Sequence, residues 1–576
     1  MSAYIIPTSD PHKSEYIPNY WKTREWLTDF SGSAGTCVVT NKHAGLWTDS
    51  RYFIQAESQL SILFKLHKLK TRGPEYQEWL IENLDFGDVV GIDGRLFSSA
   101  EIEEFEKKAS EKQIRIIDAG DLFEKIWKDR PALPSGKIIE HELKFSGKTI
   151  SQKIEEIRNG LIENRNTCTL ITALDEIAWV LNLRGNDIEY NPVFSSFLFI
   201  SLNETYLFVN ENCVSDAIRQ MLKSVNVSVL PYAKIDSHLT ELKPYSNILA
   251  DKNALNFRLS KRIPKECKIV SEPSFVAKLK VIKNSIEIEN YHQAQIRDGI
   301  AMCEYLKWLE ENVKNGDLTE YSVALKLEQF RSEQKNFMGL SFGSISAYQA
   351  NAALPHYSVD RQTASLLKPC GMYLIDSGGQ YLDGTTDITR TVALGEVTEE
   401  QKVDFTLVLK GHIRLARAKF PKGTKGFHLD TLARLDLWQH NKDYGHGTGH
   451  GIGYFLNVHE GPQGFSQATI GNASAEIIPG MLTTNEPGFY LEGKYGIRIE
   501  NVLLCEFDNS INDVEYYKFR TITYCPIDKG LIVTAMLTSD ERNWINNYHQ
   551  MVYEYLSPIA SKKLSTWLKE KTSPFK

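Results

Sequence analysis

The segment Tyr444–Pro462, YGHGTGHGIGYFLNVHEGP, contains three of the chain's fourteen histidines, namely His446, His450 and His459. Imidazoles gathered among glycines are typical of a metal or catalytic site, because glycine lets the backbone approach a ligand closely. A polar loop whose glycines form turns is the alternative that this segment alone leaves open. A catalytic metal site also needs carboxylates, and rigid elements must hold them.

Two aspartates with that potential occur in YLIDSGGQYLDGTTDITRTVAL. The apolar run before Asp376 and the alternation after Asp387 predict two strands joined by a glycine-rich loop. Antiparallel pairing of these strands would bring the two carboxylates side by side. Because aspartate is disfavoured inside strands, we expect a cation between them. Turn formation is the alternative, and it suits Asp383 better than the other two.

Two glutamates belong to a second predicted strand pair, in GMLTTNEPGFYLEGKYGIRIENVLLC. One strand ends at Glu486 before Pro-Gly, and Glu500 is expected inside the next strand. A glutamate among apolar neighbours must be paired if it is buried. The alternatives are a turn acid at Glu486 and an ion pair of Glu500 with Arg498. In the order Asp, Asp, His, Glu, Glu, the residues together predict a metal site.

The elements that position these residues fall into three blocks, as expected for 576 residues, which exceed what one core usually organises. Residues 1–130 and 131–275 share a rhythm of helices followed by a hairpin, and KDRPALPSGK between them is typical of a linker. The third block, 276–576, opens with apolar residues every three or four positions. This spacing predicts an amphipathic helix that ends at Asn315–Gly316.

Composition excludes several classes of partner. The net charge is −7 with no long run of either sign, which argues against nucleic acid and anionic membranes as partners. The eight cysteines are scattered singly without a CxxC pair, a pattern typical of reduced thiols in the cytoplasm. No signal peptide and no apolar stretch of about eighteen residues is present, so a membrane span is not expected.

The spacing D-x10-D-x62-H-x35-E-x13-E, with HGTGH, VHE, NEPG and GIRIEN around its members, resembles the pita-bread metallopeptidases. That family comprises methionine aminopeptidases, prolidases and X-Pro aminopeptidases, with creatinase as a relative. FSGSAGT, LWTDSRYFIQA, TALDEIAWVLNLRG, KGHI and WINNYH extend the resemblance to the long, three-domain cytosolic X-Pro aminopeptidases, nearly from end to end.

The resemblance implies an α/β (α+β) fold class. Two creatinase-like N-terminal domains, 1–130 and 131–275, would precede a pita-bread catalytic domain with a C-terminal helical extension, 276–576. His450 and His459 lie nine positions apart, as in the long cytosolic type, where shorter relatives typically have seven. The chain also begins almost at AYIIP, where such enzymes usually have a helical leader.

By position, the resemblance implies a dinuclear ligand set. Asp376 would hold one ion, Asp387 and Glu500 would bridge, and His450 and Glu486 would complete the second ion. Glu486 also resembles the family's proton shuttle. Four carboxylates and one imidazole suit two divalent cations, Mn²⁺ foremost, with Zn²⁺ or Co²⁺ as alternatives. Two ions about 3.5–4 Å apart can lower the pKa of a shared water and polarise the attacked carbonyl.

Other residues are implied as helpers. His446 and His459 resemble a pair that faces the substrate, and His356 in LPHYS matches a family histidine near the scissile bond. Arg498 is expected to hold a ligand carboxylate from outside the metal shell.

The implied activity is hydrolysis of the bond between a free N-terminal residue and a following proline, by a cytoplasmic homodimer. The partners are then peptides with an N-terminal X-Pro. Prolidase shares the five ligands and is the first alternative, although the two N-terminal blocks and the LNVHEGP spacing favour the aminopeptidase. A pita-bread protein that binds partners without catalysis is the second alternative, and the complete ligand set argues against it.

Overall fold

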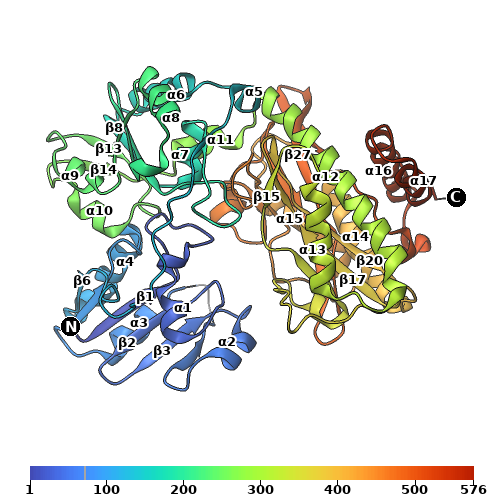
Figure 1. Ribbon diagram of the computed structural model, residues 1–576, viewed down its shortest axis with the longest axis horizontal. Coiled ribbons are helices and arrows are strands. Elements are labelled where there is room, and N and C mark those ends of the chain that lie inside the picture. The colour runs from blue at the N-terminus through green and yellow to red at the C-terminus, as the bar shows by residue number, and fades with distance from the viewer. Residues whose placement is uncertain (71–72, 576) are drawn as a thin grey trace. The chain divides into compact units, whose positions relative to one another are not determined.

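The computed structural model describes residues 1–70 and 73–575 of the chain (Figure 1). The chain forms two compact units, one of residues 1–142 and 148–276 and the other of residues 143–147 and 277–576. Among the described residues, no helix is long and apolar enough to cross a bilayer.

The first unit contains two six-stranded sheets with the same topology, β4-β3-β2-β1-β5-β6 and β12-β11-β10-β8-β13-β14. In each sheet three central strands are antiparallel, β3-β2-β1 in one and β11-β10-β8 in the other, and parallel strands flank them on both sides. The repeat predicted from the helix-then-hairpin rhythm is therefore present. The strands are β1 (Ala3–Pro7), β2 (Thr36–Thr40), β3 (Ala44–Thr48), β4 (Lys65–Lys68), β5 (Val89–Ile92), β6 (Arg115–Asp118), β8 (Cys168–Ile171), β10 (Ser196–Ser201), β11 (Thr205–Val209), β12 (Ser228–Pro231), β13 (Asn247–Leu249) and β14 (Lys268–Val270).

Helices join these strands, and local sequence sets their ends. The helix α6 (Ile150–Glu163) begins at a capping box in which the side chains of Thr149 and Gln152 each accept a backbone N–H. It buries Ile154, Ile157 and Leu161 along one face, as its apolar spacing requires. The remaining helices include α1 (Thr23–Thr28), α2 (Phe53–Gln59), α3 (Glu75–Asn83), α4 (Ser99–Ala109), α7 (Leu174–Val180), α8 (Asp216–Ser224), α9 (Lys234–Thr240) and α10 (Phe257–Arg262).

The second unit is built on two larger sheets, β16-β17-β20 and β21-β28-β27-β24, with short sheets β15-β18-β19, β22-β23 and β25-β26 beside them. The first group of strands is β15 (Phe337–Leu340), β16 (Ile345–Tyr348), β17 (Met372–Ser377), β18 (Gly379–Tyr381), β19 (Gly384–Thr385) and β20 (Ile388–Ala393). The second group is β21 (Lys419–Pro421), β22 (Gly449–His450), β23 (Gly464–Phe465), β24 (Leu482–Asn485), β25 (Gly488–Leu491), β26 (Tyr495–Arg498), β27 (Asn501–Ile511) and β28 (Val514–Thr521).

The helices of this unit are led by α12 (Ser285–Asn312), which Figure 1 shows running the length of the unit. It begins at a capping box of Asn284 and Glu287, and a 3-10 turn leads from its end to Gly316 at φ 76°. The predicted stop at Asn315–Gly316 is thus correct. Contacts of α12 reach α13 (Glu320–Ser332), α16 (Ser539–Leu556) and α17 (Lys562–Lys571). The other helices include α14 (Glu399–Ala416) and α15 (Gly426–Trp438), and α11 (Phe275–Val281) spans the boundary between the two units.

Candidate metal centre

The strands that the sequence predicts around the two aspartates are present and paired, with Asp376 on one strand and Asp387 directly before the other. β17 and β20 run antiparallel with Asp376 opposite Thr389, and Asp387 immediately precedes β20. The loop that connects them contains β18 and β19. Both aspartates are buried, which removes their carboxylates from water. Turn formation therefore does not account for them.

The glutamates occupy the ends of strands. Glu486 directly follows β24, as expected. The prediction that Glu500 lies inside a strand is wrong, because the chain leaves β26 at Arg498 and joins a different sheet in β27 at Asn501. Where the chain passes from one sheet to the other, the backbone of Glu500 is not part of either strand. Its N–H donates instead to the carbonyl of Thr389 in β20, at 3.1 Å.

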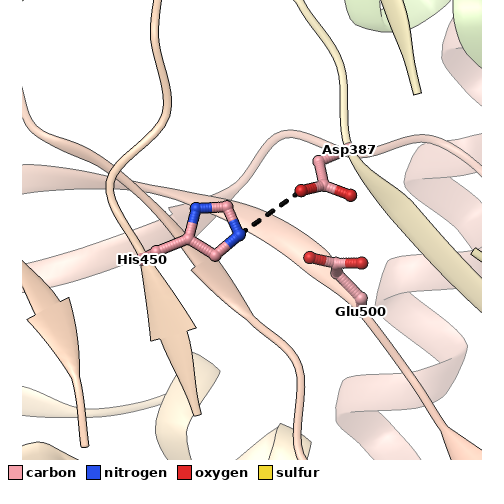
Figure 2. Close-up of side chains that lie close together, drawn as sticks. All are labelled: Asp387, His450 and Glu500. Atoms are coloured by element: carbon pink, nitrogen blue, oxygen red, sulfur yellow. Dashed lines mark ion pairs between the residues drawn. The ribbon is translucent and has the colours of Figure 1, made fainter. Parts of the chain in front are cut away.

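Figure 2 shows the side chains of Asp387, His450 and Glu500 converging. One ligand atom from each lies within 4.8 Å of the others. The Nε2 atom of His450 lies 3.4 Å from Asp387 Oδ2 and 3.5 Å from Glu486 Oε1. The Nδ1 atom of His450 is 2.9 Å from the Gly451 carbonyl, to which it can donate. In the neutral imidazole, that hydrogen bond leaves the lone pair of Nε2 directed at the carboxylates. A metal ion would displace the Nε2 proton of the charged ring and bind there.

The electrostatics of the centre favour an added cation. Burial, followed by the charges of neighbouring carboxylates, raises the pKa of Glu500 well above its usual value. Burial also raises the pKa of Glu486 to about 7, although His450 and Arg498 oppose the rise. For His450, burial lowers the pKa, but the hydrogen bond to Asp387 and the charge of Glu486 outweigh it and bring the pKa to about 9.

Asp376 provides a separate test of whether the residues fit a metal. Its Oδ1 atom is buried and has no hydrogen-bond partner among the described residues. Buried polar atoms are nearly always satisfied, so an orphaned carboxylate oxygen requires a partner. Oxygen-rich donors with one imidazole are ligands for divalent cations such as Mn²⁺. The residues present therefore fit divalent metal ions.

The expected helper Arg498 bonds to Asp376 and not to Glu500. Its Nη2 atom donates to Asp376 Oδ2 at 2.5 Å, while Glu500 accepts from the Thr389 hydroxyl at 2.7 Å. The alternative of an Arg498–Glu500 ion pair is thus not what the structure contains. Arg498 leaves Oδ1 of Asp376 open to a metal while it holds the other oxygen.

A tyrosine that the sequence reasoning missed connects Arg498 to a histidine. Arg498 donates to the Tyr490 hydroxyl at 2.6 Å, and that hydroxyl lies 2.7 Å from His446 Nε2. The other ring nitrogen of His446 lies 2.7 Å from the Gly447 carbonyl. Burial, with the charge of Arg498, lowers the pKa of His446 to about 3, so the ring is neutral near pH 7. Tyr490 stands in an ordinary apolar strand, FYL, and carries no local signal of its role.

The two remaining histidines lie nearer to solvent. The ring of His459 is 4.3 Å from that of His450 and is exposed. His356 is also exposed, on the segment after the 3-10 turn Gln349–Ala353. It lies close enough to His446 for its charge to contribute to the lowered pKa of that ring. The structure therefore gathers all of the predicted site residues in one region of the second unit.

Two further buried residues that sequence reasoning missed hold the ligand-bearing segments. Arg434 of α15 donates to the carbonyls of Tyr444 and His446, each at 2.7 Å. His412 of α14 lies 3.1 Å from the Asn485 carbonyl and accepts from the Asn501 amide at 3.0 Å. Asn485 precedes Glu486 and Asn501 follows Glu500. The KGHI stretch that includes His412 was the only signal for it.

Removing the Tyr490 hydroxyl is expected to weaken the site without emptying it. In Tyr490→Phe, Arg498 loses an acceptor and His446 loses a donor, and each buried unpaired group costs about 1–3 kcal/mol. We expect a lower urea midpoint and a fall of kcat by about tenfold or more, with the metal ligands intact. Urea unfolding measures the midpoint, metal analysis measures the metal content, and kinetics measures kcat. Tyr516→Phe, on the outer part of the β27–β28 hairpin, is the control. Unchanged stability and kcat in Tyr490→Phe would refute the link.

Comparison with known proteins identifies the class of this chain. It matches metallopeptidase family M24 over residues 289–506 and the C-terminal region of peptidase M24 over residues 515–575. The Creatinase/Prolidase N-terminal domain matches twice, over residues 2–126 and 129–287. The chain belongs to metallopeptidase family M24. The expected fold class, two creatinase-type N-terminal domains followed by a pita-bread catalytic domain, is confirmed.

Relatives of known name match over nearly their whole length. The chain is 39% identical to a probable Xaa-Pro aminopeptidase P of Laccaria bicolor, with 100% of this chain and 91% of the relative covered. It is 40% identical to Xaa-Pro aminopeptidase 1 of Dictyostelium discoideum, with 100% and 94% covered. The X-prolyl aminopeptidase of Caenorhabditis elegans, described as a cytosolic enzyme with a di-nuclear active site, has a similar structure. It gives a TM-score of 0.93 at 34% identity and covers 100% of this chain and 95% of its own.

Proposed function

We propose that this chain is an X-Pro aminopeptidase, which releases the first amino acid from peptides with proline at the second position. The observation that carries the proposal is the convergence of Asp387, His450 and Glu500 beside Asp376 and Glu486. The end-to-end similarity to proteins named Xaa-Pro aminopeptidase supports this activity over that of a dipeptidase.

We propose further that these residues hold two divalent cations, Mn²⁺ foremost. Asp387 and Glu500 would be shared between the ions, with Asp376 on one ion and His450 and Glu486 on the other. The di-nuclear site named for the C. elegans enzyme supports this number of ions. When bound, such cations polarise a carbonyl and acidify water.

The chain's own residues then orient the substrate and move protons. His459 and His356, which are both exposed, donate to the oxygen on which charge develops. Glu486, partly exposed, carries the proton from the attacking water to the departing proline nitrogen. His446, neutral and held by Tyr490, contacts the substrate without adding charge. Arg498 keeps the carboxylate of Asp376 in place.

Proline explains the specificity. An X-Pro bond is a tertiary amide, so proline offers no N–H, and its ring fixes φ. Proteases that bind their substrate through this N–H therefore do not cleave an X-Pro bond. A centre that activates water and holds the carbonyl does not need that donor.

Mass spectrometry on four peptides with added Mn²⁺ tests the proposal. We expect cleavage of Arg-Pro-Pro after its first residue, and a kcat/KM at least about tenfold lower for acetyl-Arg-Pro-Pro and for Arg-Ala-Pro, since each lacks a recognised group. The dipeptide Arg-Pro is the control for length. Cleavage confined to Arg-Pro would make the protein a prolidase. No cleavage of any peptide by metal-loaded protein would favour a binding protein without catalysis.

We also propose domain boundaries at residues 130 and 275, and a cytoplasmic homodimer. The family matches at 2–126 and 129–287 and the change of compact unit after residue 276 support the boundaries. The cysteines in the described chain are all free, and the C. elegans enzyme is called cytosolic, which supports the compartment. The homodimer rests on the family resemblance.

A further inference from the structure

Directly after His459, the side chain of Glu460 points into the protein and meets two buried lysines. Its Oε2 accepts from Lys280 Nζ and its Oε1 from Lys283 Nζ, each at 2.5 Å. The exposed fractions of Lys280, Lys283 and Glu460 are 2%, 4% and 3%. Lys283 also donates to the Lys280 carbonyl at 3.3 Å. We call these three residues the Lys–Glu–Lys triad.

Stability alone does not explain this triad. Taking a charge out of water is costly, and buried ion pairs are often no more stabilising than apolar residues of the same size. A cluster of this kind enforces one arrangement, since any other would leave a buried charge unpaired.

The arrangement that it enforces includes the histidine side of the metal centre. The N–H of Glu460 donates to the carbonyl of Gly451, the residue after His450, at 2.7 Å. The imidazole of His459 is exposed and lies 4.3 Å from the ring of His450. The side chains of these two consecutive residues thus lie in different environments. Glu460 is held in the interior, and His459 lies beside the metal centre.

We propose that the Lys–Glu–Lys triad positions His459 against the metal centre, with Glu460 as the positioning residue and the two lysines as its anchors. This inference rests on the proposed function, in which His459 donates to the reacting group. The triad itself touches no substrate. The two ion pairs fix the position of the Glu460 carboxylate, and this in turn determines where the imidazole of His459 lies.

Charge balance gives the experiment its design. Glu460→Gln alone leaves two like charges buried side by side, and we expect that variant to unfold readily. Lys283→Met alone keeps the ion pair of Lys280 with Glu460. Neutralising all three, with Lys280→Met, Lys283→Met and Glu460→Gln together, removes both ion pairs to residue 460 and all three charges of the triad. We expect the triple variant to fold, to keep its metal content, and to lose kcat by about 10- to 100-fold, as small misplacements of catalytic groups do.

A double-mutant cycle with His459→Ala separates positioning from general damage. In the His459→Ala background the same triple change should alter kcat by less than about twofold, because the group that it positions is already absent. Lys410→Met with Glu541→Gln is the matched control, since it removes a largely buried ion pair of 2.7 Å in the same unit. That control should leave kcat unchanged.

Equal losses of kcat in both backgrounds, or normal kcat in the triple variant, would overturn the proposal. If the triple variant does not fold, Lys283→Met in the same cycle decides. Amide hydrogen exchange at Glu460 provides a readout independent of turnover: the triple variant should exchange at least about tenfold faster at this position. If the wild-type protein had no activity, the proposed function would be wrong. Amide hydrogen exchange at Glu460 would still test whether the triad holds this segment.

Discussion

Asp387→Asn should abolish nearly all hydrolysis of an X-Pro peptide and release at least one metal ion per chain. Asp387 lies 3.4 Å from His450 and within the same group as Glu500, so both proposed ions would share it. Asparagine keeps the size but removes one charge and one anionic oxygen. We expect kcat to fall by more than the roughly 10²–10³-fold typical of losing a single charge-stabilising donor.

Metal analysis of unsupplemented protein and kinetics with a saturating peptide measure both effects, and circular dichroism checks the fold. Asp513→Asn, at the exposed tip of the β27–β28 hairpin where φ is 62°, is the matched control. Its backbone conformation suits asparagine as well as aspartate. If Asp387→Asn retained near-normal kcat and metal content, the shared-ligand assignment would be wrong.

A second set of substitutions distinguishes a metal ligand from a helper. His450→Ala removes the imidazole whose Nε2 faces Asp387 and Glu486, so it should lower metal content and activity together. His459→Ala and His356→Ala should leave the metal bound. We expect them to lower kcat by about 10²–10³-fold, the usual effect of losing a donor near developing charge.

Inductively coupled plasma mass spectrometry on dialysed protein measures the metal content. Kinetics at saturating metal measures kcat. His428→Ala, near the start of α15 where its ring lies beside Phe427, serves as the matched histidine control and should change neither. Metal loss in His459→Ala together with full occupancy in His450→Ala would show that the two roles are exchanged.

The elements with strong local patterns were predictable. The spacing of apolar residues in α12 and its stop at Gly316 are properties of consecutive residues, and so is the Thr149 capping box of α6. The two aspartates of the centre were found because Asp376 follows an apolar run and Asp387 precedes an alternating one. Glu500 was misplaced because its strand changes sheets there, and the bond of Glu500 to Thr389 comes from residues 111 positions away.

By itself, the sequence determined which chemistry the chain carries: an ordered set of carboxylates and histidines, two N-terminal domains of one type, and the family to which they belong. Only the tertiary structure decided which groups pair. Arg498 bonds to Asp376 and Tyr490, and Glu460 to lysines 177 and 180 positions earlier. Local propensity sets helices and strands, whereas the partner of a buried charge is set by how those elements pack, because burial leaves only nearby groups to replace the lost water.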